Sequence, residues 1–535
     1  MALKRILVFI IVLLAGGPIL AQNQSFSSKL PLVFIDTNGR HIPDEPKILV
    51  DMGIIWNGEG EDNYTSGDFN HYYGKVGIEI RGSSSQMFPK KSYGFETRNQ
   101  LGEDIDFPIL GLPEEEDWIL YAPYSDKSLI RNVLTFSLAK PLGHYTSRCR
   151  FVELFLNNEY QGIYVLMEKI KREDTRVDIA TLNPDETEGE DLTGGYIVKI
   201  DKTTGSGGDG WYSKYKNANG NATFYQYEVP DDEEIVQAQK NYIQDYINGF
   251  EDAVYYKKYE GEGSYRDYIN VNSFIDFILI SELTKNIDSY RLSTFLYKDK
   301  GGKLNAGPIW DFNLAYGNAD YLDGWNTYGF QIQAKMEDDH WGNPFWWPAL
   351  WGDRVFVNQM KCRWEELRKD AWTNQRIFEV ADSLVQAMGS ADDRNFNRWP
   401  VLGQYVWPNY YVGTSHQDEV NWLKNWLEDR LWWLDANLPG QCGEDVPEIV
   451  DEFAASVYPS PFNAELKLEV ASDVNITLTL KLFNANGSLV ESIPFSVVMG
   501  EQEFSMNTEH LPNGLYIYTL KKHNVVIQKG KLVKY

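Results

Sequence analysis

The pattern of apolar residues in this 535-residue chain changes abruptly after residue 440, and this break divides the fold into two parts. Residues 443–452 read GEDVPEIVDE, an acidic run with a proline that is typical of a linker. Beyond it, short segments such as LYIYTLKK at 515–522 alternate apolar and polar residues, as half-buried strands do. The chain is therefore predicted to end in a small all-β, immunoglobulin-like sandwich over 454–535, after a linker at 441–453.

The longer part of the chain, residues 30–440, mixes two periodicities. Strand-like alternation dominates early, for example in KVGIEIRG at 75–82 and GGYIVKIDK at 194–202. Helical spacing dominates late, notably at 271–285 and 417–436. This order of elements predicts an α+β domain, and the hydrophobic fraction of 43% is sufficient for a substantial core.

The first 21 residues form a separate unit, MALKRILVFIIVLLAGGPILA. Lys4 and Arg5 precede an apolar run, and the small residue Ala21 suits cleavage. The run is too short for a stable anchor, so we predict a signal peptide at 1–21. Elsewhere no apolar stretch approaches the ~18 residues of a transmembrane helix, so we expect no membrane span in the mature chain.

Acidic residues outnumber basic residues by 77 to 50, which gives a formal charge of −27. A chain this acidic repels nucleic acid and anionic lipid, so we expect no nucleic-acid partner. Surplus carboxylates keep a protein in solution, and they also supply the oxygen ligands that Mg²⁺ and Ca²⁺ prefer.

The cysteines and histidines argue against a zinc site. Cys149, Cys362 and Cys442 are widely spaced, and the seven histidines form no HExxH motif. One disulfide is possible among the three cysteines, with one thiol left over.

Two aspartates flank a predicted β-hairpin in the middle of the chain. A mostly apolar helix at 274–286 leads to Asp288, then to the strand STFLYKD, the turn DKGGK at 299–303 and the return strand KLNAGPIWD, which ends at Asp311. Because antiparallel neighbours lie only about 5 Å apart, the hairpin is predicted to bring both carboxylates into one cleft. Taken alone, either aspartate fits a helix cap or a turn. Together they indicate a metal site or an acid–base site.

A glycine motif nearby is a weaker signal. Gly205, Gly207 and Gly210 satisfy GxGxxG, but the sequence that follows has no helical pattern. A dinucleotide site needs that helix for the pyrophosphate, so a loop is the better interpretation.

The hairpin and its surroundings resemble the CotH kinase family. NIDSYRLSTFLYKD at 286–299 and KLNAGPIWDFNLAYGNADY at 303–321 carry the likeness, with RGSSSQMFPKKSYGFE at 81–96 and ELFLNNEYQGIYVLMEKIK at 153–171. It spans roughly residues 50 to 440. The resemblance implies an atypical protein-kinase-like fold over 30–440. It also implies transfer of the γ-phosphate of ATP to Ser or Thr of a protein substrate, with Mg²⁺ or Mn²⁺.

The family's catalytic roles can be carried over residue by residue. Asp288 resembles the catalytic-loop aspartate and Asp311 the metal-binding aspartate. Lys91 resembles the lysine that contacts the ATP phosphates, with its neighbour Lys90 as the rival. Glu168 is expected to pair with that lysine, and the alternative is a surface charge.

Further candidates are less specific. Arg81 and Arg131 are expected either to clamp phosphate or to form structural ion pairs. Typical protein kinases place a metal-binding Asn five residues after the catalytic Asp, and here that position is Ser293. Asn313 stands where many relatives have an aspartate, and with Asn318 it completes the predicted metal ligands.

The last segments resemble the type IX (type A) secretion sorting domain. VYPSPFNAELKLEV at 457–470 and LPNGLYIYTLKKHNVVIQKGKLVKY at 511–535 carry this second likeness. It implies passage through the type IX machinery and a secreted or cell-surface protein.

Two other functions remain open at this stage. A non-catalytic surface protein on the same fold could bind glycans or proteins, with the aromatic run HWGNPFWWPALW at 340–351 stacking on sugars, although core packing suits that run better. Carbohydrate hydrolysis by Asp288 and Asp311 would require one of two defined carboxylate separations, which a sequence does not give.

Overall fold

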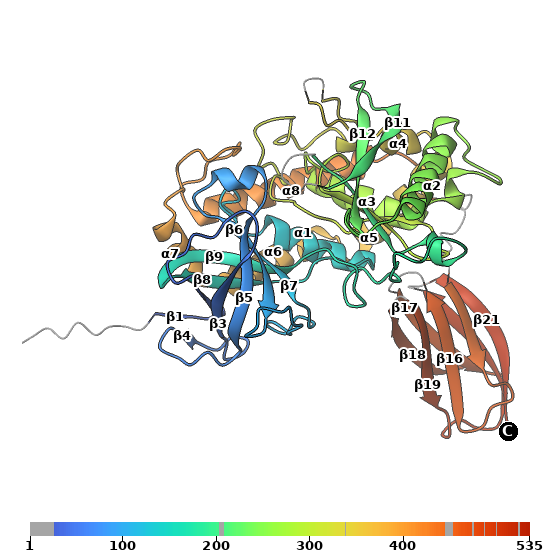
Figure 1. Ribbon diagram of the computed structural model, residues 1–535. Coiled ribbons are helices and arrows are strands. Elements are labelled where there is room, and N and C mark those ends of the chain that lie inside the picture. The colour runs from blue at the N-terminus through green and yellow to red at the C-terminus, as the bar shows by residue number, and fades with distance from the viewer. Residues whose placement is uncertain are drawn as a thin grey trace, which may run out of the picture.

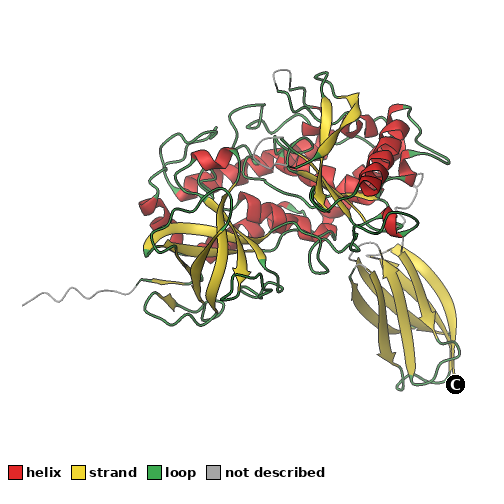
Figure 2. Cartoon of the chain, viewed as in Figure 1, coloured by secondary structure: helices red, strands yellow, loops and turns green. Residues whose placement is uncertain are grey.

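The structure is a computed structural model that describes residues 26–202, 208–336, 339–443, 453–472, 476–485, 487–498, 500–522 and 525–535. The predicted signal peptide lies outside these ranges, as do Gly205, Gly207 and most of the predicted linker. Figures 1 and 2 show a mixed helical and β body followed by an all-β region. The prediction of a mixed helix-and-sheet domain that precedes an all-β end is confirmed.

The N-terminal part of the body contains a closed β-barrel, drawn in blue to teal in Figure 1. Around the barrel the strands are β2 (Leu32–Asp36), β3 (Ile48–Ile55), β5 (Tyr72–Arg81), β6 (Ser92–Arg98), β7 (Asp117–Tyr121), β9 (Glu159–Glu168) and β8 (Cys149–Leu156). All neighbours are antiparallel except β2 and β8, whose parallel pairing closes the barrel. Alternate residues such as Val50, Val76 and Leu154 fill the interior. The small pair β1 (Ser27–Ser28) and β4 (Asn63–Tyr64) lies outside this barrel.

A second, five-stranded sheet follows the barrel in the chain. Its order is β11 (Gly210–Lys216), β12 (Ala222–Val229), β10 (Tyr196–Ile200), β13 (Thr294–Lys298) and β14 (Leu304–Ala306). This sheet lies in the middle of the sequence, so the predicted order of strands first and helices afterwards is only partly right. Its formation needs β10 to pair with β13, which begins more than ninety residues later.

Helices pack between and around the two sheets (Figure 2). They are α1 (Arg131–Ala139), α2 (Gln237–Tyr255), α3 (Val271–Thr284), α4 (Trp346–Leu350), α5 (Arg354–Lys369), α6 (Asn374–Met388), α7 (Ala391–Arg398) and α8 (His416–Asn437). The helices predicted at 271–285 and 417–436 correspond to α3 and α8. Helix α3 is the centre of the core, since every residue from Ser273 to Thr284 is buried and the helix contacts α1, α5, α8 and β14.

The aromatic run at 340–351 belongs to this core. Trp346 and Trp347 are fully buried. Trp347 stacks on Phe277 of α3 with ring centroids 5.2 Å apart. These two indole rings therefore stabilise the core and are not available to stack on a sugar.

The predicted hairpin forms, but its return strand is shorter than expected. Strand β14 ends at Ala306, so Asp311 lies 311 − 306 = 5 residues beyond it. The next residues are Gly307, with a φ of +122°, and Pro308. Because proline has no N–H to donate to a ladder, the strand stops and the chain leaves as a loop.

The C-terminal region is a two-sheet sandwich, drawn in orange to red in Figure 1. One sheet contains β15 (Phe453–Tyr458), β16 (Glu465–Ser472) and β19 (Gly500–Asn507), and the other contains β18 (Leu489–Val497), β17 (Ile476–Asn484), β20 (Gly514–Lys522) and β21 (Val525–Lys534). Leu466, Leu468, Leu480 and Leu520 alternate with exposed polar residues and are buried between the sheets.

Cys362 of α5 forms a disulfide with Cys442, which fixes the end of the body, and Cys149 is a free thiol. In the part of the chain that the structure describes, no helix combines the length and the apolar character needed to cross a bilayer.

Candidate active site

Helix α3 and the hairpin β13–β14 place Asp288. The helix is capped at its start by the Asn270 side chain, which accepts from two backbone N–H groups, and it ends at Lys285 in a left-handed conformation with a φ of +42°. The chain then turns through Asp288 into β13. The Arg291 guanidinium donates to Asp288 Oδ1 at 2.6 Å and to Asp339 Oδ2 at 2.7 Å. The Asp288 carboxylate is therefore held in one orientation, with its side chain 18% exposed.

One amide side chain ties the two predicted acidic loops together. Asn286 Nδ2 donates to the backbone oxygen of Asp311 at 3.0 Å, and Asn286 Oδ1 accepts from the Asp288 N–H at 3.4 Å. Asn286 is buried, so these bonds are shielded from water. Asn286 is not among the predicted site residues, because its role depends on the fold of the 307–311 loop.

The carboxylate of Asp288 lies close enough to Asp311 to affect its ionisation. Asp311 is half-buried and has a φ of +61°, a conformation that Asp tolerates better than most residues. Burial raises the pKa of Asp311 to about 7, and the negative charges of Asp288 and Asp201 add to the rise. Lys202 and Arg81 act against it. The acidic pair predicted from the hairpin is thus brought together, with further charged groups around it.

The third carboxylate, Asp201, was not among the predicted site residues. It follows β10 directly, and the β10–β13 ladder pairs Ile200 with Thr294. Asp201 therefore lies beside Ser293, whose Oγ is 3.5 Å from Asp201 Oδ2. Burial, followed by the charge of Asp288, raises the pKa of Asp201. The sequence marks Asp201 only as the end of a strand.

Among the predicted cations, Arg81 is near this cluster. It ends β5, where it pairs with Ser92 of β6. Burial lowers its pKa, and Asp311 is among the carboxylates that counter this effect. Lys91 lies at the same end of the barrel, immediately before Ser92, and its Nζ donates to the Gln86 backbone oxygen.

The rival lysine, Lys90, has a structural role. It is 3% exposed, and its Nζ donates to the Ile163 oxygen at 2.6 Å and to Asn395 Oδ1 at 2.9 Å. The ammonium also lies 5.0 Å from the Tyr164 ring centroid. Lys90 thus joins β9 to α7, and burial lowers its pKa well below the usual range.

The predicted pairing of Glu168 with Lys91 is wrong. Glu168 is fully buried and accepts from the Arg148 guanidinium, with Arg148 Nη2 2.6 Å from Glu168 Oε1. Tyr145 also donates to Glu168 Oε2, at 3.1 Å. Neighbouring charges in the sequence do not reveal this, because Arg148 reaches Glu168 across the β8–β9 pair.

Two other predicted residues are occupied by structural bonds. Arg131 is buried at the start of α1, where it pairs with Asp126 at 2.5 Å and donates to the Ala315 oxygen at 3.0 Å. Of the two alternatives for Arg131, the structure therefore has the ion pair. Asn318 is 2% exposed, and its amide donates to the Asn313 oxygen at 2.8 Å while its oxygen accepts from Asn409. The side chains of Arg131 and Asn318 are therefore both held by structural bonds.

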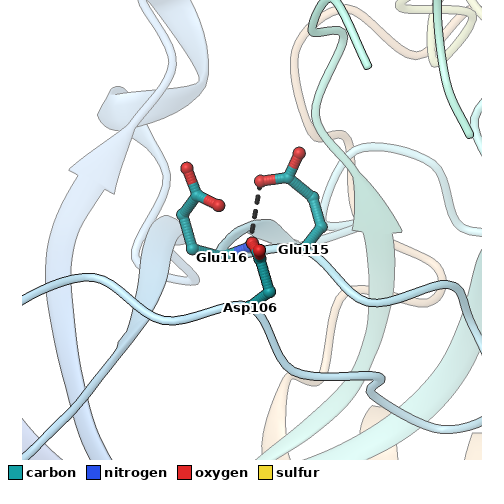
Figure 3. Close-up of side chains that lie close together, drawn as sticks. All are labelled: Asp106, Glu115 and Glu116. Carbon is teal, nitrogen blue, oxygen red and sulfur yellow. Dashed lines mark hydrogen bonds between the residues drawn. The ribbon is translucent and has the colours of Figure 1, made fainter. Parts of the chain in front are cut away.

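A different acidic group lies on the barrel (Figure 3). Asp106, Glu115 and Glu116 bring carboxylate oxygens within 4.8 Å of one another, the one group of three metal-type ligands this close in the described ranges. Lys171 donates to Glu115 at 2.9 Å and also to Glu116, so an ammonium already contacts two of the three carboxylates. The carboxylates of Asp201, Asp288 and Asp311 are spaced more widely than this.

A family model described as CotH kinase protein matches residues 78–434, and one described as secretion system C-terminal sorting domain matches residues 456–534. Both resemblances seen in the sequence are thereby confirmed. No curated protein matches the chain.

The solved structures that show some similarity include a β-glucosidase from Listeria innocua and a β-D-glucoside glucohydrolase from Trichoderma reesei. Their identities are 13% and 10%, and each alignment covers 16% of this chain. The chain spans only 16% and 19% of those proteins, with TM-scores of 0.13 and 0.12. Similarity this slight carries no argument about fold or function.

Proposed function

Because the chain belongs to the CotH kinase protein family, we propose that its larger domain is a metal-dependent protein kinase with an atypical kinase-like fold. It transfers the γ-phosphate of ATP to a Ser or Thr hydroxyl of another protein. The observation that supports this proposal is that Asn286 bonds to the backbone of both Asp288 and Asp311, which holds the two acids near the open end of the hairpin, where the charge of Asp288 acts on Asp311. Protein kinases use two acids in this relation, one for the acceptor hydroxyl and one for the metal.

The C-terminal domain determines where this activity would occur. Its match to a secretion system sorting domain indicates export to the cell surface or beyond. Recognition by the type IX machinery, entry through the signal peptide at 1–21 and later removal of the sorting domain are the finer steps of this proposal. The acceptor is accordingly a protein outside the cell or on its surface.

Asp288 would act on the acceptor hydroxyl. One of its oxygens is bound by Arg291, which fixes the carboxylate, and the other is left to accept the hydroxyl proton. As that proton moves to Asp288, the acceptor oxygen bonds to the γ-phosphorus and the bond to the β-phosphate oxygen breaks, leaving ADP. Arg291 thus has a positioning role.

The residues around Asp311 fit a divalent cation. Asp201, Asp288 and Asp311 lie near enough to act on one another: burial, and then the charges of Asp288 and Asp201, raise the pKa of Asp311 to about 7. A cation would relieve the repulsion between these charges. Asp311 would hold Mg²⁺ or Mn²⁺, with Asn313 as a neutral oxygen ligand two residues later. Such a cation would supply charge neutralisation for the ATP phosphates, and Arg81 and Lys91 at the barrel end would contact phosphate oxygens.

The test is phosphate transfer by the chain from residue 22 onward, with labelled ATP and Mg²⁺ or Mn²⁺. Asp288→Ala and Asp311→Ala are each expected to lower transfer by about 10²–10⁴-fold. Asp245→Asn removes a negative charge from the exposed side of α2, so it serves as the matched control and is expected to keep full activity. Transfer that survives both alanine substitutions would contradict the proposal.

A second candidate function is supported by one feature of the site. Ser293 stands where a typical kinase has its metal-binding Asn, which favours a surface protein that binds nucleotide or a protein partner without catalysis. In this case ATP with Mg²⁺ would raise the melting temperature, but no acceptor would become labelled.

A further inference from the structure

We infer that Asp201 is a second carboxylate ligand for the divalent cation of this site, in place of the amide that Ser293 does not provide. The inference rests on the proposed kinase function. It assigns a role to a residue that the family motifs around Asp288 and Asp311 do not include.

The position of Asp201 follows from the sheet. Strands β10 and β13 are antiparallel, with Tyr196 opposite Lys298 and Ile200 opposite Thr294. One step further along the ladder, Asp201 faces Ser293 at the end of the sheet where Asp288 lies. Because neighbouring strands are about 5 Å apart, a side chain on β10 reaches the space in front of β13. The 3.5 Å separation between Ser293 Oγ and Asp201 Oδ2 confirms that it does.

The ligand expected at Ser293 follows from the spacing of this residue from Asp288. Ser293 lies 293 − 288 = 5 residues after Asp288, the spacing at which typical protein kinases place an Asn that holds the second metal ion. A serine hydroxyl is shorter than an Asn side chain and is a weaker ligand. The Asp201 carboxylate stands beside it, on the same side of the sheet, and supplies an oxygen with a full negative charge.

Asp201 retains the capacity to bind a cation. Its Oδ1 accepts from the Lys202 N–H at 2.8 Å, and its Oδ2 has the contact with Ser293. A carboxylate offers about four lone-pair sites, so two such contacts leave others for a metal. The nearby strand lysine, Lys199, is engaged elsewhere, because it pairs with Glu228 at 2.7 Å.

The wide spacing of Asp201, Asp288 and Asp311 suits the binding of more than one group. The carboxylates of Asp201, Asp288 and Asp311 do not close to within 4.8 Å around one point, unlike the acids on the barrel. A wider arrangement suits cations that share their coordination with phosphate oxygens, as in nucleotide sites where Mg²⁺ keeps only one or two protein carboxylates. The added charge of Asp201 also offsets the neutral Asn313.

The experiment is a Mn²⁺ titration of the full chain followed by electron paramagnetic resonance, with and without a non-hydrolysable ATP analogue. Asp201→Asn is expected to weaken Mn²⁺ binding in the presence of the analogue by about tenfold or more. The amide keeps the acceptor for the Lys202 N–H, so folding is preserved, which circular dichroism and the melting temperature check. Asp245→Asn on α2 is the charge-matched control and should bind as the parent chain does.

A rescue variant separates ligation from a structural role. Adding Ser293→Asn to Asp201→Asn restores an amide oxygen at the kinase-like position, so part of the lost Mn²⁺ affinity should return. Equal Mn²⁺ affinity in Asp201→Asn and Asp245→Asn would overturn the inference while leaving the kinase proposal intact. A parent chain that binds neither Mn²⁺ nor the analogue would overturn both.

Discussion

The raised pKa of Asp311 makes a quantitative prediction about stability. The carboxyl group titrates near 3.8 in an unfolded chain and at about 7 in the folded protein, mainly because of burial and then because of the charges of Asp288 and Asp201. Below pH 3.8 the group is protonated in both states and has no effect. Between these two values only the unfolded state ionises, so the stability of the folded state falls as pH rises. Above pH 7 the loss is complete.

The size of the effect follows from the shift. Each pKa unit corresponds to about 1.4 kcal/mol, so a shift of about three units gives an upper limit of roughly 4 kcal/mol. Partial exposure of Asp311 allows solvent screening, and we therefore expect about 1–3 kcal/mol. Asp311→Asn removes the ionisation and preserves the shape of the side chain. The variant should be more stable than the parent at pH 8 by this amount. The difference should be smaller at pH 4.5, where the unfolded carboxyl is already mostly ionised, and close to zero at pH 3.

The assay is urea denaturation of both proteins between pH 3 and 8.5 in the absence of divalent cations. The difference in unfolding free energy between variant and parent should grow with pH and level off above pH 7. Asp288→Asn provides an internal check, because removing that charge lowers the pKa of Asp311 and moves the rise to lower pH. A difference that does not vary with pH, or a variant less stable than the parent at pH 8, would refute the electrostatic account of the cluster.

Three further predictions concern residues outside the cluster. Lys90→Met should lower the unfolding free energy by about 1–3 kcal/mol, because two buried oxygen acceptors each lose one donor; a thermal melt with unchanged stability would argue against the structural role. Cys362→Ser opens a disulfide that joins residues 80 apart, and we expect denaturant titrations to show a loss of about 3–4 kcal/mol in unfolding free energy. The thiol that is already free in the parent chain should be unchanged. Trp347→Ala should lower the unfolding free energy by about 3–5 kcal/mol, because the ring lies in the core, and should leave any exposed sugar site unaffected. A folded variant that loses glycan binding would contradict this place in the core.

Local sequence determined the elements that carry the two predicted acids. The apolar spacing of 274–286 produces helix α3, the paired glycines at 301 and 302 produce the turn, and the alternation before and after it produces the hairpin. These signals lie within about forty residues, where the chain's own periodicity and turn chemistry decide the conformation. The approach of Asp288 to Asp311 could be predicted for that reason, even though β14 ends before Asp311.

Contacts between distant segments decided everything else about the site. Asp201 precedes Asp288 by 288 − 201 = 87 residues, and only the pairing of β10 with β13 brings them together. Lys90 and Lys91 are adjacent in the sequence, yet one is buried against β9 and α7 while the other is half-exposed, because neighbouring residues of an extended chain point in opposite directions. Glu168 pairs with Arg148 for a similar reason, because the β8–β9 pairing places the two side chains together. Sequence periodicity specifies which face of a strand is apolar, whereas the partner that a charged side chain meets is specified only when sheets and helices have packed, because burial then makes each unpaired charge costly.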